Sequence, residues 1–207
     1  MSILTSAIAI IKDKTAVEAG YVNNPDDLGG PTIWGITQQT ANEDEYKHLW
    51  GQFNWNGDMR TMPKEMAYAI YKQGWWDKMQ LDRIAAYSWP LAERLFDFAI
   101  NAGRVNCAQS LQKVLNSLNR NQQLWSDITP LGTTIGPVTL KALDDSMKAF
   151  KNDPHWVQQL CMLMFSMQNY HYVHISLERA RNETFTKGWV NRVYRDFYIY
   201  AKWLTGN

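Results

Sequence analysis

Apolar residues recur at helical spacing along most of the chain, and the first such stretch covers residues 3–18. Two rows of apolar side chains, each at intervals of four residues, predict a helix with one apolar face there. Gly20 follows as a C-terminal stop, because glycine readily adopts the left-handed conformation that ends helices. The pattern therefore puts the carboxylate of Glu18 at the end of the first helix.

Later stretches with the same periodicity predict further helices, and residues typical of helix ends mark several of their boundaries. Thr37 is a candidate N-cap, and Pro63 and Pro137 suit the first turns of helices. Ser88 with Pro90 marks another start, and the helix that follows is apolar around most of its circumference, which is typical of a buried central helix. The predicted helices cover residues 37–50, 63–74, 88–103, 104–118, 137–150, 154–181 and 187–204.

Two stretches depart from the helical pattern. Tyr21-Val22 and Thr32-Ile33-Trp34 lie on either side of turn-forming residues, which predicts a small hairpin within residues 21–36. Residues 119–136 are rich in Asn, Gln, Thr and Gly and predict an internal linker or a long exposed loop. No internal repeat is visible, so the sequence predicts a mainly α fold with one small β element.

Composition and charge narrow the classes of function. Hydrophobic residues make up 45% and aromatic residues 13% of the chain, which argues against a disordered polypeptide. A net charge of +1 argues against a dedicated nucleic-acid binder. Residues 12–60 carry four basic and eight acidic side chains, whereas residues 179–202 carry six basic and two acidic ones. The second segment either meets an anionic polymer such as a bacterial wall or forms an ordinary solvated helix face.

The cysteines and the N-terminal residues bear on where the protein works. Cys107 and Cys161 are isolated, which predicts reduced thiols in a cytosolic setting and no disulfide framework. Residues 2–11 are apolar but few and lack a basic region before them, so they fit neither a signal peptide nor a membrane span. We expect synthesis in the cytoplasm, no stable membrane insertion, and delivery to the cell wall by another agent.

Three polar residues around the predicted hairpin have the chemistry of glycoside cleavage, which needs a proton donor and a second group that activates water. Glu18 ends an apolar helix, and partial desolvation there favours the protonated form of a carboxyl group. Asp27, in a polar glycine-rich loop, is expected to stay ionised, and the hydroxyl of Thr32 could hold a water with it. By spacing alone, the same residues also fit an exposed glutamate followed by an Asx-rich turn.

Other candidate chemistries have less support. His171, His174 and Glu178 share one helix face, but they lack the His-Glu-x-x-His order and a further ligand motif, so we predict no metal site. Phosphate-loop, dinucleotide and nucleophile-elbow motifs are absent, and we predict no cofactor. Tyr21 is a candidate to line a cleft beside the catalytic glutamate. Trp34 fits sugar stacking and core packing equally well.

Longer motifs, spread over residues 18–193, resemble those of one protein family. They are Glu18-Ala-Gly-Tyr21, Asn24-Pro-Asp-Asp27, Gly29-Gly-Pro-Thr32, Gly35-Ile-Thr37, Gly57-Asp-Met-Arg60, Phe96-Asp-Phe-Ala-Ile-Asn-Ala-Gly103, Ile135-Gly-Pro-Val-Thr-Leu140 and Gly188-Trp-Val-Asn-Arg-Val193. The run is similar to the glycoside hydrolase family 108 muramidases, which include phage endolysins and proteins once called secretion activators. The resemblance implies a lysozyme-like helical fold, with a catalytic part in residues 1–103. It also implies a helical peptidoglycan-binding part in residues 104–207, packed into the same globule.

The resemblance also implies roles for particular residues. Glu18 matches the general acid of the family, and Asp27 and Thr32 match the residues that position the attacking water. The chain has Ala19 where the family usually has glycine, and the added Cβ can shift Glu18 slightly. The catalytic residues implied by the resemblance are therefore the three that the chemistry of the hairpin region already indicated.

Candidate substrate contacts lie in or beside these motifs. Asn101 falls in the motif that ends at Gly103 and is a candidate to bind substrate, as are Tyr21 and Trp34. The acidic residue that is common before the Ile-Gly-Pro motif is replaced here by Thr133 or Thr134. That replacement bears on wall binding by residues 104–207, and the alternative is that these residues only complete the helical core.

The function expected from these observations is that of an N-acetylmuramidase, which hydrolyses the β-1,4 bond between N-acetylmuramic acid and N-acetylglucosamine. We expect a monomer that acts on peptidoglycan glycan strands and not on nucleic acid. It would reach the periplasmic or extracellular wall after release or export, as a phage endolysin or as a wall-loosening secretion helper. Two alternatives stay open: a lytic transglycosylase, and a non-catalytic peptidoglycan-binding or structural protein.

Overall fold

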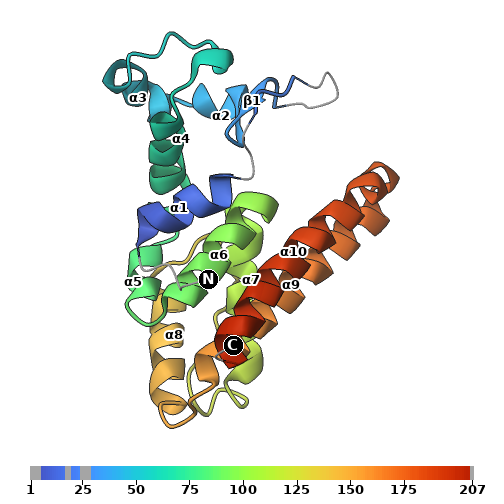
Figure 1. Ribbon diagram of the computed structural model, residues 1–207. Coiled ribbons are helices and arrows are strands. Elements are labelled where there is room, and N and C mark those ends of the chain that lie inside the picture. The colour runs from blue at the N-terminus through green and yellow to red at the C-terminus, as the bar shows by residue number, and fades with distance from the viewer. Residues whose placement is uncertain (1–5, 17–19, 24–28, 206–207) are drawn as a thin grey trace. The chain divides into compact units, whose positions relative to one another are not determined.

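The structure, a computed structural model, describes residues 6–16, 20–23 and 29–205, with side chains as far as residue 201 (Figure 1). Within these residues the regular strands are β1 (Thr32–Ile33) and β2 (Ile36–Thr37), and helices dominate elsewhere. The prediction of a mainly α fold with one small β element is confirmed. The chain divides into two compact units, Leu4–Asp77 and Lys78–Asn207.

In the Leu4–Asp77 unit, the described residues form α-helices and the hairpin. The helices are α1 (Ala7–Ala16), α2 (Gln38–Ala41), α3 (Lys47–Gln52) and α4 (Lys64–Tyr71), with short 3-10 turns at Asp44–Tyr46 and Met59–Thr61 and a π-helical turn at Lys72–Asp77. Ile10 and Ile11 on α1 are fully buried, and α1 packs against α4. The predicted apolar face of α4 is confirmed, because Met66 and Ile70 are fully buried. Apolar spacing alone located this helix pair.

The helix predicted over residues 37–50 is interrupted. Thr37 caps α2 as predicted, since its hydroxyl accepts a hydrogen bond of 3.1 Å from the amide of Thr40. The helix ends at Ala41, because Glu43 leaves the helical region with φ −59° and ψ 138°. The indole of Trp50 then donates a hydrogen bond of 3.0 Å to the carbonyl of Ala41. A tertiary contact thus replaces one of the hydrogen bonds that a continuous helix would have made.

Gly74 lies where the chain passes closest to Tyr46. A Cβ at Gly74 would come within 2.1 Å of the Tyr46 hydroxyl and 3.1 Å of its ring carbon Cζ. We expect Gly74→Ala to lower the free energy of unfolding by about 1–3 kcal/mol through overpacking. Gly51→Ala is the matched control, because a Cβ there meets no atom within 4 Å. Urea denaturation should show the loss for Gly74→Ala alone, and equal stabilities of the two variants would contradict the close approach.

In the Lys78–Asn207 unit, all regular structure among the described residues, up to residue 205, is helical. Its helices are α5 (Leu81–Ala85), α6 (Trp89–Ala102), α7 (Arg104–Leu118), α8 (Pro137–Ala149), α9 (Trp156–Glu178) and α10 (Glu183–Thr205), with a 3-10 turn at Ala180–Asn182. Five of these helices confirm predictions, and α5 was not predicted because five residues are too few to show a period. Ser88 caps α6 by accepting a hydrogen bond of 3.3 Å from the amide of Leu91. Gly103 ends α6 with φ 88°, a conformation that favours glycine.

Residues 119–136 form a loop, as predicted, but the loop is not a fully exposed linker. Trp125, Ile128 and Ile135 within it are buried. The side-chain amide of Asn116 on α7 holds Ile128 at both ends, accepting 2.8 Å from its amide and donating 3.1 Å to its carbonyl. Polar side chains of the loop also bond its backbone, because Asn119 accepts 3.1 Å from the amide of Gln122 and Gln122 accepts 3.4 Å from the amide of Asp127.

The long helices α9 and α10 lie side by side and antiparallel (Figure 1). Phe165, Tyr172 and Val193 form a buried cluster between them, with partly buried Trp189 and Phe197 packed against it. The predicted burial of α6 is confirmed, because apolar residues such as Leu95 and Phe98 are fully buried. Throughout the described part of the chain, no helix is long and apolar enough to cross a lipid bilayer.

Candidate active site

The hairpin of β1 and β2 is the element that positions the described candidate residues. Thr32 pairs with Thr37 and Ile33 with Ile36, so Trp34 and Gly35 form a two-residue turn. Both turn residues have positive φ, 54° and 75°, as a type I′ turn requires. Ile33 and Ile36 are buried and anchor the hairpin. The tight turn therefore places Thr32 and Trp34 at defined positions.

The hairpin differs in register from the predicted one. The prediction paired Tyr21-Val22 with residues 32–34, whereas the structure pairs β1 with the residues that follow it. Val22 joins Thr32 through a single bridge, with reciprocal N–H to O hydrogen bonds of 2.8 Å. Trp34 is consequently a turn residue and not part of a strand. Gly35 adopts positive φ without strain, which favours the two-residue turn between β1 and β2.

Thr32 is half-buried at the start of β1, and its hydroxyl is oriented by one hydrogen bond. The hydroxyl donates to the carbonyl of Gly30 at 3.1 Å. A hydroxyl oxygen has two lone pairs, so it can still accept a hydrogen bond from a water molecule. This geometry fits the predicted role of Thr32 in holding a water.

Trp34 is held by contacts on several sides. Its indole N–H donates 3.0 Å to the carbonyl of Met62, and its own carbonyl accepts 3.3 Å from the hydroxyl of Tyr71. The ammonium of Lys64 lies 5.1 Å from the ring centroid. Trp34 is half-buried, so its exposure lies between that of a core residue and that of an open sugar-stacking platform, the two roles that the sequence left open. Fixed at both ends, the ring offers a rigid surface for stacking.

Tyr21 is 39% exposed and follows Gly20 at the edge of the same region. The guanidinium of Arg60 lies 5.7 Å from the centroid of its ring. Neither Arg60 nor Lys64 was among the predicted site residues, although both place cations over candidate aromatic rings. The Gly57–Arg60 motif was the available signal for Arg60, and nothing in the sequence pattern marked Lys64.

Glu18 and Asp27, the predicted proton donor and its partner, lie outside the described residues, as does Ala19. Their roles stay predictions. Asn101 belongs to the Lys78–Asn207 unit, where its amide donates 2.7 Å to the carbonyl of Asp97 and accepts a hydrogen bond from Arg192. The bond from Arg192 ties α10 to α6, and the predicted substrate contact of Asn101 stays a prediction.

The histidines and the cysteine that the sequence analysis rejected as metal ligands or nucleophiles have other roles in the structure. His174 pairs with Glu178 at 3.2 Å, while His171 lies against Phe98, with ring centroids 6.4 Å apart. Burial lowers the pKa of His171. Among the described residues, no group of three His, Cys, Asp or Glu side chains is arranged to hold a metal ion. Burial raises the pKa of the Cys107 thiol, which disfavours a thiolate nucleophile there.

Two family models match consecutive parts of the chain. A family model described as glycosyl hydrolase 108 matches residues 11–103, and one described as a predicted peptidoglycan domain matches residues 106–194. The fold is similar to the solved structure of SagA from Brucella abortus, with a TM-score of 0.59 and 24% identity over 92% of this chain and 90% of that chain. No curated protein matches the sequence. The predicted division into residues 1–103 and 104–207 stays a prediction.

Proposed function

We propose that this chain, which belongs to the glycosyl hydrolase 108 family and is a glycoside hydrolase that acts on peptidoglycan, is specifically an N-acetylmuramidase. The bond that it hydrolyses is the β-1,4 bond between N-acetylmuramic acid and N-acetylglucosamine. The observation that supports this most is the family match over residues 11–103, which spans Glu18, Asp27 and the Thr32 hairpin.

The proposed reaction is a single displacement. Glu18 donates a proton to the glycosidic oxygen as the bond to the anomeric carbon breaks, and the sugar leaves as an alcohol. Asp27 and Thr32 hold a water molecule, and Asp27 takes its proton as the water oxygen attacks the anomeric carbon. The hydroxyl of Thr32 suits this role, because its donation to Gly30 leaves its oxygen free to accept from the water.

Product analysis tests the proposal. Purified peptidoglycan would be digested with the chain and the soluble fragments identified by mass spectrometry. Hydrolysis gives fragments with a reducing N-acetylmuramic acid end. Anhydro products lighter by one water would identify a lytic transglycosylase instead, and binding to sacculi without soluble fragments would identify a non-catalytic wall protein.

We expect Thr32→Val to lower the turnover of peptidoglycan roughly 100-fold, because a small misplacement of a reacting group costs about that much. Valine has the shape and strand preference of threonine, so β1 should persist. Thr32→Ser, which keeps the hydroxyl, is the matched control and should retain most activity. Release of reducing ends measures both variants, and a valine variant as fast as the serine variant would remove Thr32 from the mechanism.

The proposed setting is the bacterial wall, reached after the chain leaves the cytoplasm in which it is made. A phage endolysin and a muramidase that loosens the wall for secretion both fit this setting. Expression inside bacteria with and without a membrane-permeabilising holin separates them, since an endolysin should lyse the culture only when the holin is present.

A further inference from the structure

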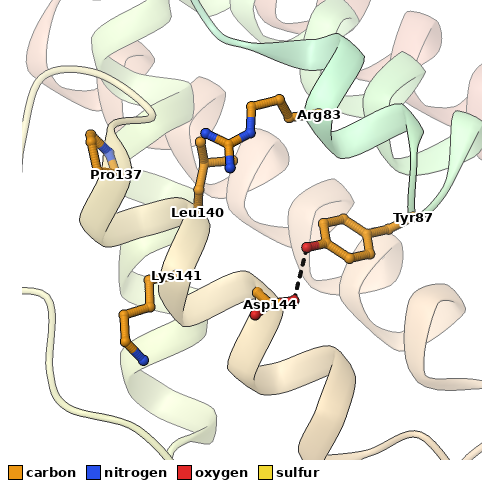
Figure 2. Close-up of a pocket in the computed structure, with 6 residues that line it drawn as sticks. All are labelled: Arg83, Tyr87, Pro137, Leu140, Lys141 and Asp144. Carbon is orange, nitrogen blue, oxygen red and sulfur yellow. Dashed lines mark hydrogen bonds between the residues drawn. The ribbon is translucent and has the colours of Figure 1, made fainter.

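A groove in the Lys78–Asn207 unit lies between α5 with its following turn and the first half of α8 (Figure 2). Its volume is about 420 Å³, within the range of small-ligand sites. Six residues line it: Arg83, Tyr87, Pro137, Leu140, Lys141 and Asp144. None of them belongs to the candidate active site, so the groove calls for an explanation of its own.

Two side-chain hydrogen bonds fix the groove at its ends. The amide of Gln80 donates 2.7 Å to the carbonyl of Ile135, just before α8 begins. The hydroxyl of Tyr87 donates 3.0 Å to the carboxylate of Asp144, two turns further along α8 (Figure 2). Because both ends of the α5 segment are tied to the α8 segment, the groove is formed before any ligand arrives.

Of the charged residues that line the groove, Lys141 and Asp144 form ion pairs and Arg83 forms none with a described residue. Lys141 pairs with Asp145, and Asp144 pairs with Lys148 while it accepts from Tyr87. Hydrogen bonds from Lys148 and Tyr87 lower the pKa of Asp144, so this carboxylate is ionised and already satisfied.

Arg83 differs from these charged neighbours. Its guanidinium makes no ion pair and no side-chain hydrogen bond with any residue that the structure describes. Figure 2 shows it reaching over the groove toward α8. A guanidinium presents a planar fork of N–H donors that matches a carboxylate at two points. The groove therefore favours an anionic group at Arg83.

The remaining surface favours a peptide over a bare sugar. Leu140 is only 5% exposed and, with Pro137, provides an apolar wall for aliphatic groups. From Pro137 to Asp144 the helix advances about 10 Å, at 1.5 Å per residue. A peptide of about three extended residues covers that length. A neutral sugar would leave the charge of Arg83 without a partner.

We propose that this groove binds the short acidic peptide carried by the muramic acid residues of peptidoglycan, with a peptide carboxylate on Arg83. The inference rests on the proposed function, in that it takes peptidoglycan as the substrate. It adds a recognition site for the peptide, separate from the residues that cleave the glycan. The site would let the enzyme favour walls whose peptides are intact.

A binding measurement with a free peptide tests the groove directly. The probe is the tripeptide L-alanyl-γ-D-glutamyl-meso-diaminopimelate, titrated into the full chain by calorimetry. We expect Arg83→Gln to weaken binding at least tenfold, and the parent to bind the carboxyl-amidated tripeptide equally weakly. Lys113→Gln, which removes one exposed charge on α7, is the matched control and should bind like the parent. Equal affinities of the parent and Arg83→Gln, or no binding to the parent, would overturn the proposal.

Turnover separates this proposal from the proposed function. The ratio of activity on peptide-bearing walls to activity on glycan chains stripped of peptide should fall about tenfold in Arg83→Gln and stay unchanged in Lys113→Gln. An unchanged ratio in Arg83→Gln would assign the groove to another ligand. Failure of the parent to cleave either substrate would refute the muramidase activity alone, because the peptide titration needs no turnover.

Discussion

Glu18→Gln is expected to lower peptidoglycan hydrolysis about 100- to 10,000-fold, the range that a positioned general acid contributes. The amide has nearly the shape of the carboxyl group, but it cannot give a proton to the leaving oxygen. Without that proton the sugar must depart as an alkoxide, a far poorer leaving group. Binding to the wall should persist, because the substitution removes an acid and leaves the shape of the cleft intact.

Turbidity loss of purified sacculi and release of reducing ends measure this effect. Glu43→Gln is the matched control, since Glu43 is exposed in the same unit and its side chain makes no capping hydrogen bond. Both variants should have the unfolding midpoint of the parent, so that a loss of rate is not a loss of fold. A Glu18→Gln protein that digests sacculi as fast as Glu43→Gln would refute the assignment of the general acid.

Arg94→Met is expected to lower the free energy of unfolding by about 3–5 kcal/mol, the cost of leaving buried charge without its partner. Arg94 on α6 is 3% exposed and donates hydrogen bonds to Asp97 and, at 2.5 Å, to Gln168 on α9. Asp196 on α10 lies 3.7 Å from the guanidinium. Burial alone would lower the pKa of Arg94, but the two carboxylates outweigh it and raise the pKa. The charge thus links three helices.

The loss should be specific to buried charge. Lys141→Met breaks an exposed ion pair with Asp145, and such pairs contribute only about 0–1 kcal/mol. Adding Asp97→Asn to Arg94→Met removes one stranded carboxylate and should recover part of the lost stability. Urea denaturation followed by circular dichroism measures all three proteins. An Arg94→Met protein as stable as Lys141→Met would show that the buried ion pairs contribute no net stability.

The sequence predicted the helices and the family membership well, for identifiable reasons. The sequence located boundaries at Thr37, Ser88, Gly103 and Pro137, because N-caps, C-terminal glycines and first-turn prolines act within a few residues of the helix end. The break after Ala41 was missed, because it depends on Trp50 reaching back to a helix carbonyl. The family was recognised from motifs spread over residues 18–193, and the models for glycosyl hydrolase 108 and for a peptidoglycan domain match residues 11–103 and 106–194.

The candidate site was predicted only in part. Thr32 was identified from a motif and Trp34 as an aromatic residue suited to sugar stacking, and the structure places both on one hairpin. Their neighbours Arg60 and Lys64 were missed, because each lies far along the chain from its aromatic ring: Arg60 is 39 positions from Tyr21, and Lys64 is 30 positions from Trp34. Periodicity and local turn signals carry no information on contacts at that separation.

By itself, the sequence determined the helical class and the main helix boundaries, because both follow from spacing and from local capping residues. It also predicted Glu18, Asp27 and Thr32 as the catalytic residues, from contiguous motifs. Only the tertiary structure decided the register of the hairpin, the burial of Arg94 with its carboxylates, and the groove at Arg83. These features depend on which side chains meet from distant parts of the chain. The sequence alone does not tell a buried, paired arginine such as Arg94 from an exposed one such as Arg83. Only the packing of the helices around each side chain separates the two cases.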